Sequence, residues 1–266
     1  MNVGSLADHQ EQVTILGSRV HLLDVHRAVE VMESWLERRD GLCRQVVVTG
    51  FHGLWCAFRD PELRARLNAA DLWVPDGIAP VWIARSYGFR AARRAPGAEL
   101  MAAYFQRADA KGYSSFFLGD TDETLTRLSE TVSRRYPGHR VAGTYSPPFG
   151  PGGREADDRA DDRVIEMINA AKPDVLWVAL GMPKQEQWIA AHVDRLQVPI
   201  AAGVGAAFGF IAGTVRRAPA VVGDLGLEWA WRLAADPRRT YRRVFFEGPP
   251  FVACVLLERL GLWTFR

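Results

Sequence analysis

Short apolar stretches alternate with segments of helical periodicity along most of this 266-residue chain. The clearest apolar stretches are QVVVTG, SSFFLG, DVLWVALG and VPIAAGVG. Continuous apolar strands separated by helices are typical of a parallel sheet that is covered on both faces. The alternation therefore predicts an α/β fold, with a Rossmann-like, largely parallel sheet and helices on both faces.

The two ends of the chain depart from this alternation. VTILG and VHLLDV predict a short β-hairpin around Gly17 and Ser18, and the sequence after Ala218 has helical periodicity throughout. We therefore expect an α/β domain at residues 1–218 and a helical C-terminal appendage at residues 219–266.

Charge is distributed unevenly along the chain. The net charge is +2, but the residues from Arg216 onward contain nine Arg and no Lys against five Asp or Glu. Arginine-rich sequence beside the apolar segment FFEGPPFVACVLLERLGLWTF suits phosphate groups together with a membrane surface or a protein partner. We expect no nucleic-acid partner.

Targeting and redox features favour the cytosol. The N-terminal sequence lacks a basic segment followed by an apolar run, so we expect no secretory signal. No window reaches the roughly 18 uninterrupted apolar residues of a membrane-spanning helix. Cys43, Cys56 and Cys254 are scattered without metal-ligand spacing. We therefore expect reduced cysteines that serve as small apolar packing residues. The sequence thus predicts a protein that is soluble or peripheral to a membrane.

Several common cofactor and enzyme motifs are missing. The chain has no GxGxxG after its first strand and no GxxxxGK[ST], GxSxG or HExxH. Dinucleotide-binding, P-loop, hydrolase and zinc-enzyme classes therefore lack their signatures, and we expect no cofactor. GVGAAFG, which contains Gly203 and Gly205, has the wrong spacing for a pyrophosphate loop and indicates close backbone approach near a ligand.

The turn LGMPKQE follows an apolar strand and opens a helix. The carboxyl ends of parallel strands and the N-termini of helices attract anionic ligands. Gly181 permits close backbone approach, Lys184 adds positive charge, and Gln185 can both donate and accept hydrogen bonds. The alternative is an ordinary strand-to-helix connection with a solvated Lys and Glu.

Two further strand ends carry carboxylates. Asp76 stands between Pro75 and Gly77 among apolar neighbours, where a carboxylate can act as a general base or cap the following helix. Asp120-Thr121-Asp122 is a D-x-D pattern, which can hold a divalent ion that bridges a sugar-nucleotide diphosphate. Capping of the next helix by Asp120 or Thr121 is the interpretation that we favour for this pattern.

The order of several motifs resembles a known family. Thr49 near a strand end precedes DPELRARLNAADLWVPDGIAPVWIAR, RAPGAELM, LGMPKQEQWIA, GVGAAFGFIAGTVRRAP and GLEWAWRLAADPRRTYRRV. Together these segments resemble the WecG/TagA/CpsF glycosyltransferases, glycosyltransferase family 26, from about Val13 to about Glu258.

The resemblance implies a GT-E-type fold and a hexosyltransferase. The expected reaction moves a sugar from a UDP-sugar to a polyprenyl-diphosphate-linked saccharide in cell-surface polysaccharide biosynthesis, with inversion at the anomeric carbon and without a metal. The expected place is the cytoplasm, peripheral on the inner face of the plasma membrane. The appendage is expected to reach the membrane and complete the active site, and family members can form homo-oligomers.

The resemblance also assigns roles to residues. Asp76 corresponds to the general base, Thr49 to a substrate-positioning threonine, Arg94 to the arginine of an RVxG segment, and Gln185 to the glutamine of PKQE. The substrate-binding arginines of the appendage correspond to Arg232, Arg239 and Arg242. These three share roughly one helix face if Pro237 begins a new helix.

This chain departs from the family pattern at several positions. The family's T-P-N is Thr49-Gly50-Phe51 here, followed by His52, so His52 is a candidate replacement for the missing Asn, with an exposed or satisfied histidine as the alternative. The Asp that usually ends GVGGxFD is Gly209, and RVxG is Arg94-Ala95-Pro96-Gly97. The changes affect the expected sugar more than the expected reaction.

Two other classes of function are alternatives to a glycosyltransferase. A non-catalytic nucleotide-sugar-binding or scaffold protein would keep the fold and bind UDP without releasing it from a donor. A nucleotide-cofactor oxidoreductase is disfavoured by the missing glycine fingerprint.

Overall fold

The computed structural model describes residues 11–148, 158–216, 218–219, 222, 227–235 and 237–263, without the side chains of 158–160, 228, 232, 235 and 239. Eight strands and a series of helices follow one another within these described residues. The strands are β1 (Gln12–Ile15), β2 (Ser18–His21), β3 (Arg44–Thr49), β4 (Leu72–Pro75), β5 (Ser114–Gly119), β6 (Arg140–Tyr145), β7 (Val175–Ala179) and β8 (Ile200–Gly203).

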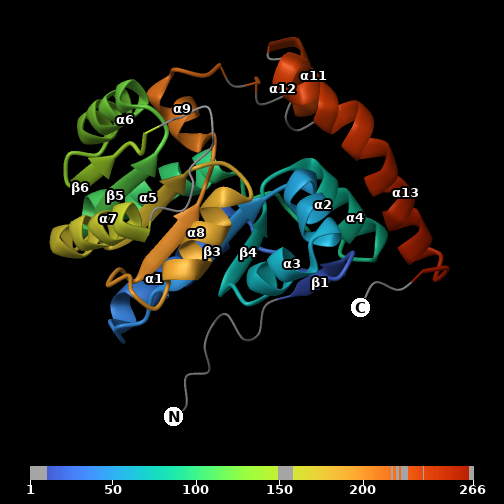
Figure 1. Ribbon diagram of the computed structural model, residues 1–266, viewed down its shortest axis with the longest axis horizontal. Helices are drawn as coiled ribbons and strands as arrows, with labels where there is room; N and C mark the ends of the chain where they lie inside the picture. The colour runs from blue at the N-terminus through green and yellow to red at the C-terminus, as the bar shows by residue number, and fades with distance from the viewer. Residues whose placement is uncertain are drawn as a thin grey trace. The chain divides into compact units, whose positions relative to one another are not determined.

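The helices occupy the connections and the C-terminal region (Figure 1). They are α1 (Val25–Arg38), α2 (Phe51–Arg59), α3 (Pro61–Asn68), α4 (Ile78–Ser86), α5 (Gly97–Lys111), α6 (Asp122–Arg135), α7 (Asp158–Ala171), α8 (Lys184–His192), α9 (Ala207–Ala212), α11 (Glu228–Ala235), α12 (Pro237–Arg242), the π-helical turn η1 (Arg243–Glu247) and α13 (Gly248–Arg259).

Six strands form one sheet, in the order β4-β3-β8-β7-β5-β6. The pairs β3 with β8, β8 with β7, β7 with β5 and β5 with β6 are all parallel. β1 and β2 form a separate antiparallel hairpin in which Val13 pairs with Val20. The predicted α/β class with a largely parallel sheet is confirmed, and so is the N-terminal hairpin.

The chain divides into two compact units. Unit 1 comprises residues Met1–Val25, Val48–Pro96 and Arg216–Arg266, and unit 2 comprises His26–Val47 and Gly97–Val215. The boundary falls inside β3, between Val47 and Val48. The C-terminal residues thus belong to the same unit as α2, β4 and α4, while the expected division at residue 218 stays a prediction.

Alternate residues of the strands in unit 2 face different helices. Phe116 and Leu176 belong to a buried cluster that contains apolar side chains of α7 and α8. Phe117 and Trp177, their neighbours in sequence, contact Phe105 of α5, with ring centroids 6.1 Å apart in both pairs. Because successive side chains of a strand point to opposite faces, helices cover both faces of this part of the sheet.

Aromatic packing joins α2 of unit 1 to the C-terminal α13. The ring of Phe251 is buried, 5.8 Å from the ring of Phe51 and 6.4 Å from that of Trp55. Figure 1 shows α13 in red, and this helix contacts α2. Glu258 attaches the far end of α13, because one carboxylate oxygen accepts hydrogen bonds from the Leu16 amide at 3.0 Å and the Tyr87 hydroxyl at 3.1 Å.

Helix α2 is not among the elements expected from the sequence. It is followed by α3, where the Asp60 carboxylate caps the helix by accepting hydrogen bonds from the amides of Glu62 and Leu63. α2 has Gly50 at its N-cap and no side-chain cap hydrogen bond, so its start carries no polar signal in the sequence.

Much of the apolar surface lies on the C-terminal helices. Among the described residues, eleven of the fifteen exposed large hydrophobic side chains fall between Leu227 and Trp263. Leu260 and Leu262 are 69% and 72% exposed. No helix in the described stretches combines the length and apolar character that crossing a bilayer requires.

Candidate functional site

The ends of β3 and β4 are joined by their backbones. The amide of Asp76 donates a hydrogen bond to the carbonyl oxygen of Thr49 over 3.1 Å. A β-carbon placed on Gly50 would lie 3.5 Å from the amide nitrogen of Gly77, so these two glycines are close neighbours. α2 begins after Gly50 and α4 begins after Gly77.

The two helix N-termini at this place lack side-chain caps. Neither Gly50 nor Gly77 has a side chain that could satisfy the first amides of its helix. Unpaired amides and the helix dipole give such ends a positive potential, and two of them side by side favour an anionic ligand. Gly77, and not Asp76, occupies the N-cap of α4.

The chain brings the backbone of Arg94 to the same strand end. The amide of Ala95 donates to the carbonyl oxygen of Pro75 over 2.8 Å. Arg94 precedes Ala95 and Asp76 follows Pro75, so the two predicted site residues flank one hydrogen bond. Both side chains are half-buried.

The Thr49 side chain is buried. It is only 6% exposed, and a β-carbon on Gly53 would lie 2.1 Å from its Oγ1. The Thr49 side chain therefore occupies the space beside the backbone of α2, and only glycine fits at position 53. This packing fixes where α2 starts, and direct contact of Thr49 with a substrate stays a prediction.

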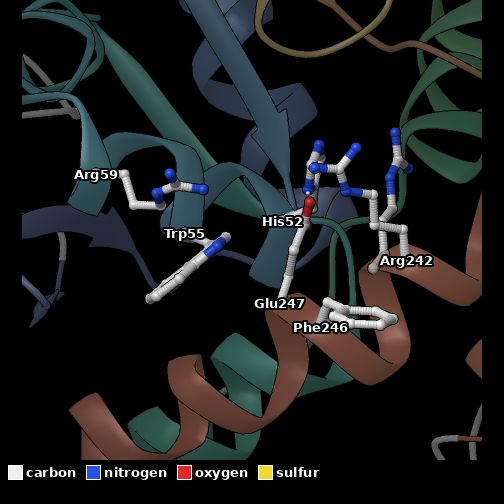
Figure 2. A pocket seen from close by; sticks show the side chains of 7 residues that line it. His52, Trp55, Arg59, Arg242, Phe246 and Glu247 are labelled. Carbon is white, nitrogen blue, oxygen red and sulfur yellow. Dashed lines mark hydrogen bonds and ion pairs between the residues drawn. The ribbon is translucent and has the colours of Figure 1, made fainter.

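A cavity of about 370 Å³ lies between α2 and the C-terminal segment of unit 1. Figure 2 shows the side chains that line it, which are His52, Trp55 and Arg59 of α2 and Arg242, Arg243, Phe246 and Glu247. The structure thus brings two predicted site residues, His52 and Arg242, into one pocket.

His52 is held by a carboxylate from the C-terminal segment. Its Nδ1 lies 2.7 Å from Oε2 of Glu247, and its Nε2 lies 3.8 Å from the sulfur of Cys56. Burial and the charge of Arg243 lower the pKa of His52, against the opposing effect of Glu247. His52 therefore has a side-chain partner and connects α2 with η1, while its contact with a substrate stays a prediction.

Two of the three predicted appendage arginines have side chains outside the described residues. These are Arg232 and Arg239, in α11 and α12. Pro237 is the first residue of α12, as the prediction of a shared face required. Arg242 is exposed and lines the cavity.

The LGMPKQE turn lies in unit 2, where Gln185 is only 2% exposed. Its Oε1 accepts from the Gly181 amide at 3.1 Å, and its Nε2 donates to Oε1 of Glu186 at 2.8 Å. β-Carbons on Gly203 and Gly205 would lie 3.0 Å and 3.7 Å from the amide group of Gln185. Gly203 and Gly205, both predicted site residues, therefore lie beside the Gln185 side chain and help to hold its amide group in place.

Lys184 and Glu186 differ in their environment. Lys184 is exposed, as the solvated alternative for this turn proposed. Glu186 is only 1% exposed, so that alternative is wrong for the carboxylate. Burial raises the pKa of Glu186 from 4.5 to about 7, and its Oε2 has no hydrogen-bond partner among the described residues.

The sequence holds a signal for this buried pair. Gln185 and Glu186 each stand three residues before a buried apolar residue of α8, Trp188 and Ile189. Residues three apart share a helix face, so the apolar face of α8 extends to the polar pair. Gln45 adds a further contact, because its Nε2 donates to the carbonyl oxygen of Glu186 at 3.1 Å.

The D-x-D segment forms a helix start. Thr121 is the N-cap of α6, and its Oγ1 accepts from the Thr124 amide at 3.2 Å. Asp122 is the first residue of the helix. The capping interpretation of this segment is confirmed.

The predicted site residues fall into two groups. Thr49, His52, Asp76, Arg94 and the appendage arginines belong to unit 1, and Gly181, Lys184, Gln185, Gly203 and Gly205 belong to unit 2. A parallel α/β sheet with polar side chains and uncapped helix N-termini at its strand ends is typical of enzymes that bind phosphorylated substrates.

Comparison with known proteins shows the family. The model described as "Glycosyl transferase WecG/TagA/CpsF family" matches residues 13–264. The chain belongs to this family of glycosyl transferases, which confirms the resemblance seen in its motifs.

Named relatives are similar over most of the chain. A Bacillus spizizenii protein named N-acetylglucosaminyldiphosphoundecaprenol N-acetyl-beta-D-mannosaminyltransferase is 33% identical over 200 residues, 75% of this chain and 74% of that protein. A protein of the same name from Staphylococcus aureus is 31% identical over 176 residues, 66% of each chain.

Proposed function

We propose that this chain transfers a sugar from a UDP-sugar to a saccharide carried on a polyprenyl diphosphate, as a step in cell-surface polysaccharide assembly. The family match and the names of both relatives support this class of acceptor and of reaction. The observation that carries the proposal is the placement of Asp76 at a strand end, beside two helix N-termini without side-chain caps.

Asp76 is the proposed general base. It takes the proton from the acceptor hydroxyl while the hydroxyl oxygen bonds to the anomeric carbon of the donor. The bond from that carbon to the diphosphate oxygen breaks, and the configuration at the carbon inverts. UDP leaves with the electron pair of the broken bond.

The departing diphosphate gains negative charge as the bond breaks. The amides at the starts of α2 and α4 are suited to stabilise it, because their donors are fixed before the reaction. Arg94 and the appendage arginines Arg232, Arg239 and Arg242 are the proposed cationic groups that bind the phosphates of the two substrates. With these groups in place, the proposed transfer requires no metal ion.

Gln185 is proposed to bind a substrate. Its amide group is fixed, and the backbone around it permits a ligand to approach closely. Its side chain is held by Gly181 and Glu186, so it presents one orientation. Gly181, Gly203 and Gly205 permit close approach, and Lys184 adds an exposed charge at the start of α8.

The C-terminal segment is proposed to hold the enzyme on the inner face of the plasma membrane. The segment carries exposed apolar side chains such as Phe245, Leu256 and Leu260 as well as the exposed arginines Arg242 and Arg259. Apolar burial together with cationic attraction to anionic lipid is the usual basis of peripheral binding.

A donor screen tests the function. Purified full-length protein is mixed with a prenyl-diphosphate-linked N-acetylglucosamine and one UDP-sugar at a time, and UDP release is measured. We expect release with at least one UDP-N-acetylhexosamine, only in the presence of acceptor, and undiminished by excess chelator. UDP binding without release from any donor would favour the non-catalytic alternative, and loss of activity with chelator would contradict metal independence.

A further inference from the structure

Trp55 has a buried indole N–H that lacks an acceptor. Its Nε1 has no hydrogen-bond partner among the described residues, although it is shielded from solvent. The ring is held in place by the Arg59 guanidinium 5.9 Å from its centroid, by stacking on Phe58 at 5.4 Å and by the edge of Phe251 at 6.4 Å. A buried donor without a partner is costly, so a ligand that supplies an acceptor would be favoured there.

The same pocket has an excess of positive charge. Among the described residues, Arg59, Arg242 and Arg243 line it together with one carboxylate, that of Glu247. Burial and the charge of Arg243 lower the pKa of His52, which disfavours a further positive charge on its ring. Arginine guanidinium groups pair well with phosphate oxygens, so the pocket favours a ligand with several anionic oxygens.

Exposed apolar side chains follow these charged residues along the chain. Phe246 lines the pocket and is 63% exposed, and the adjacent Phe245 is 52% exposed. Exposed Val252 and Leu256 follow along α13. A ligand that carries phosphate at one end and a hydrocarbon chain at the other would use both features, whereas a nucleoside would leave its polar base beside apolar surface.

We propose that this pocket binds the diphosphate of a prenyl diphosphate, with Trp55 Nε1 and Arg59 donating to phosphate oxygens and Phe246 contacting the hydrocarbon chain. The proposal rests on the proposed function, since the prenyl diphosphate is part of its acceptor. The UDP-sugar is the other source of a diphosphate in that reaction.

Binding is tested without turnover by the indole N–H signals of the full-length protein in a ¹H–¹⁵N spectrum. Trp55→Phe identifies the Trp55 signal and keeps an aromatic ring in the pocket. Farnesyl diphosphate, UDP and inorganic pyrophosphate are titrated separately. We expect farnesyl diphosphate to shift the Trp55 signal saturably, pyrophosphate to do so more weakly, and UDP to leave it unchanged.

The charge contribution is tested by Arg59→Gln, which we expect to weaken farnesyl diphosphate binding by about tenfold. Arg66→Gln is the matched control, because Arg66 is an exposed arginine of α3 outside the pocket. No shift with farnesyl diphosphate, or a shift with UDP alone, would overturn the proposal. Equal binding of pyrophosphate and farnesyl diphosphate would overturn the contact with the hydrocarbon chain.

A kinetic comparison gives the second measurement. Trp55→Phe should raise the KM for a prenyl-diphosphate-linked acceptor about tenfold while leaving kcat and the KM for the UDP-sugar nearly unchanged. Trp82→Phe is the control, since Trp82 is an exposed tryptophan of α4 outside the pocket. A rise confined to the KM of the donor would contradict the proposal. If farnesyl diphosphate shifts the Trp55 signal but the protein transfers no sugar, the proposed function is wrong and the proposed binding site is supported.

Discussion

Asp76 and Thr49 are connected by a backbone hydrogen bond of 3.1 Å, from the amide of Asp76 to the carbonyl oxygen of Thr49. The bond joins the ends of β4 and β3, and Thr49 in turn packs against the backbone of α2 at Gly53. A proposed base is thus attached to rigid elements and not to a free loop. A general base must be held in a fixed position to accept a proton efficiently, and this attachment provides such a position.

Glu186 should make stability depend on pH in a defined direction. Its folded-state pKa is raised from 4.5 to about 7 by burial, so its stabilising effect is complete below pH 4.5 and is lost as the pH rises through 7. In Glu186→Gln the new side chain stays neutral at both pH values, and its amide oxygen can still accept the hydrogen bond from Gln185. We expect the stability of this variant relative to the original chain to increase by roughly 2 kcal/mol between pH 5 and pH 8.

Urea unfolding at the two pH values measures this difference. Glu166→Gln is the control, because Glu166 is exposed on α7 and should give the same relative stability at both. An effect of Glu186→Gln that does not vary with pH would show that the buried carboxylate is not responsible.

Gly203 should be intolerant of a side chain because of Gln185. A β-carbon there would lie 3.0 Å from Nε2 of Gln185 and 3.1 Å from Oε1 of Glu186. We expect Gly203→Ala to destabilise the protein by about 1–3 kcal/mol and to lower activity by displacing the amide. Combined with Gln185→Ala, it should cost much less than the sum of the two changes in a double-mutant cycle. Additive effects would contradict this steric account.

Glu258 should hold the end of α13 against Leu16 and Tyr87. Glu258→Ala removes the acceptor for both the Leu16 amide and the Tyr87 hydroxyl, so we expect a loss of about 1–2 kcal/mol in chemical unfolding. Tyr87→Phe removes only one of these bonds and should cost less. The carboxylate also helps burial to raise the pKa of Tyr87 to about 12, so Glu258→Ala should lower that pKa in a spectroscopic titration. An unchanged tyrosine titration would argue against this contact.

Membrane binding should depend on individual exposed leucines of the C-terminal segment. Leu260 is 69% exposed at the end of α13, and Leu260→Ser should reduce partitioning onto anionic vesicles by about tenfold if its side chain enters the bilayer. Leu42 is 60% exposed in unit 2 and provides the matched control, Leu42→Ser. Equal sedimentation of both variants with vesicles would count against the proposed membrane surface.

Local sequence patterns were sufficient for most of the sheet. β5 and β7 are buried at every position, so their continuous apolar runs predict strands covered on both faces. The turn residues around Gly17 predicted the hairpin, and Thr121 predicted the start of α6. In each case the determining residues are neighbours in sequence.

Features that depend on distant residues were not predicted. His52 and Glu247 are separated by 195 positions, and nothing near His52 indicates its partner. The spacing within α8 indicates which face Glu186 shares, but its contacts with Gly203 of β8 and Gln45 of β3 come from distant parts of the sequence. α2 begins at a glycine, so no capping side chain marks it. These contacts arise from tertiary packing, which a local pattern does not contain.

The central claim is that Asp76 is the base of a glycosyltransferase, and Asp76→Asn tests it most directly. Acceptor-dependent UDP release is measured for this variant with the donor found in the screen, beside Asp122→Asn from the helix start of α6 as control. We expect Asp76→Asn to lower kcat by about 10²–10⁴-fold with UDP affinity retained, and Asp122→Asn to keep full activity. Sugar transfer by Asp76→Asn at the original rate would contradict the claim.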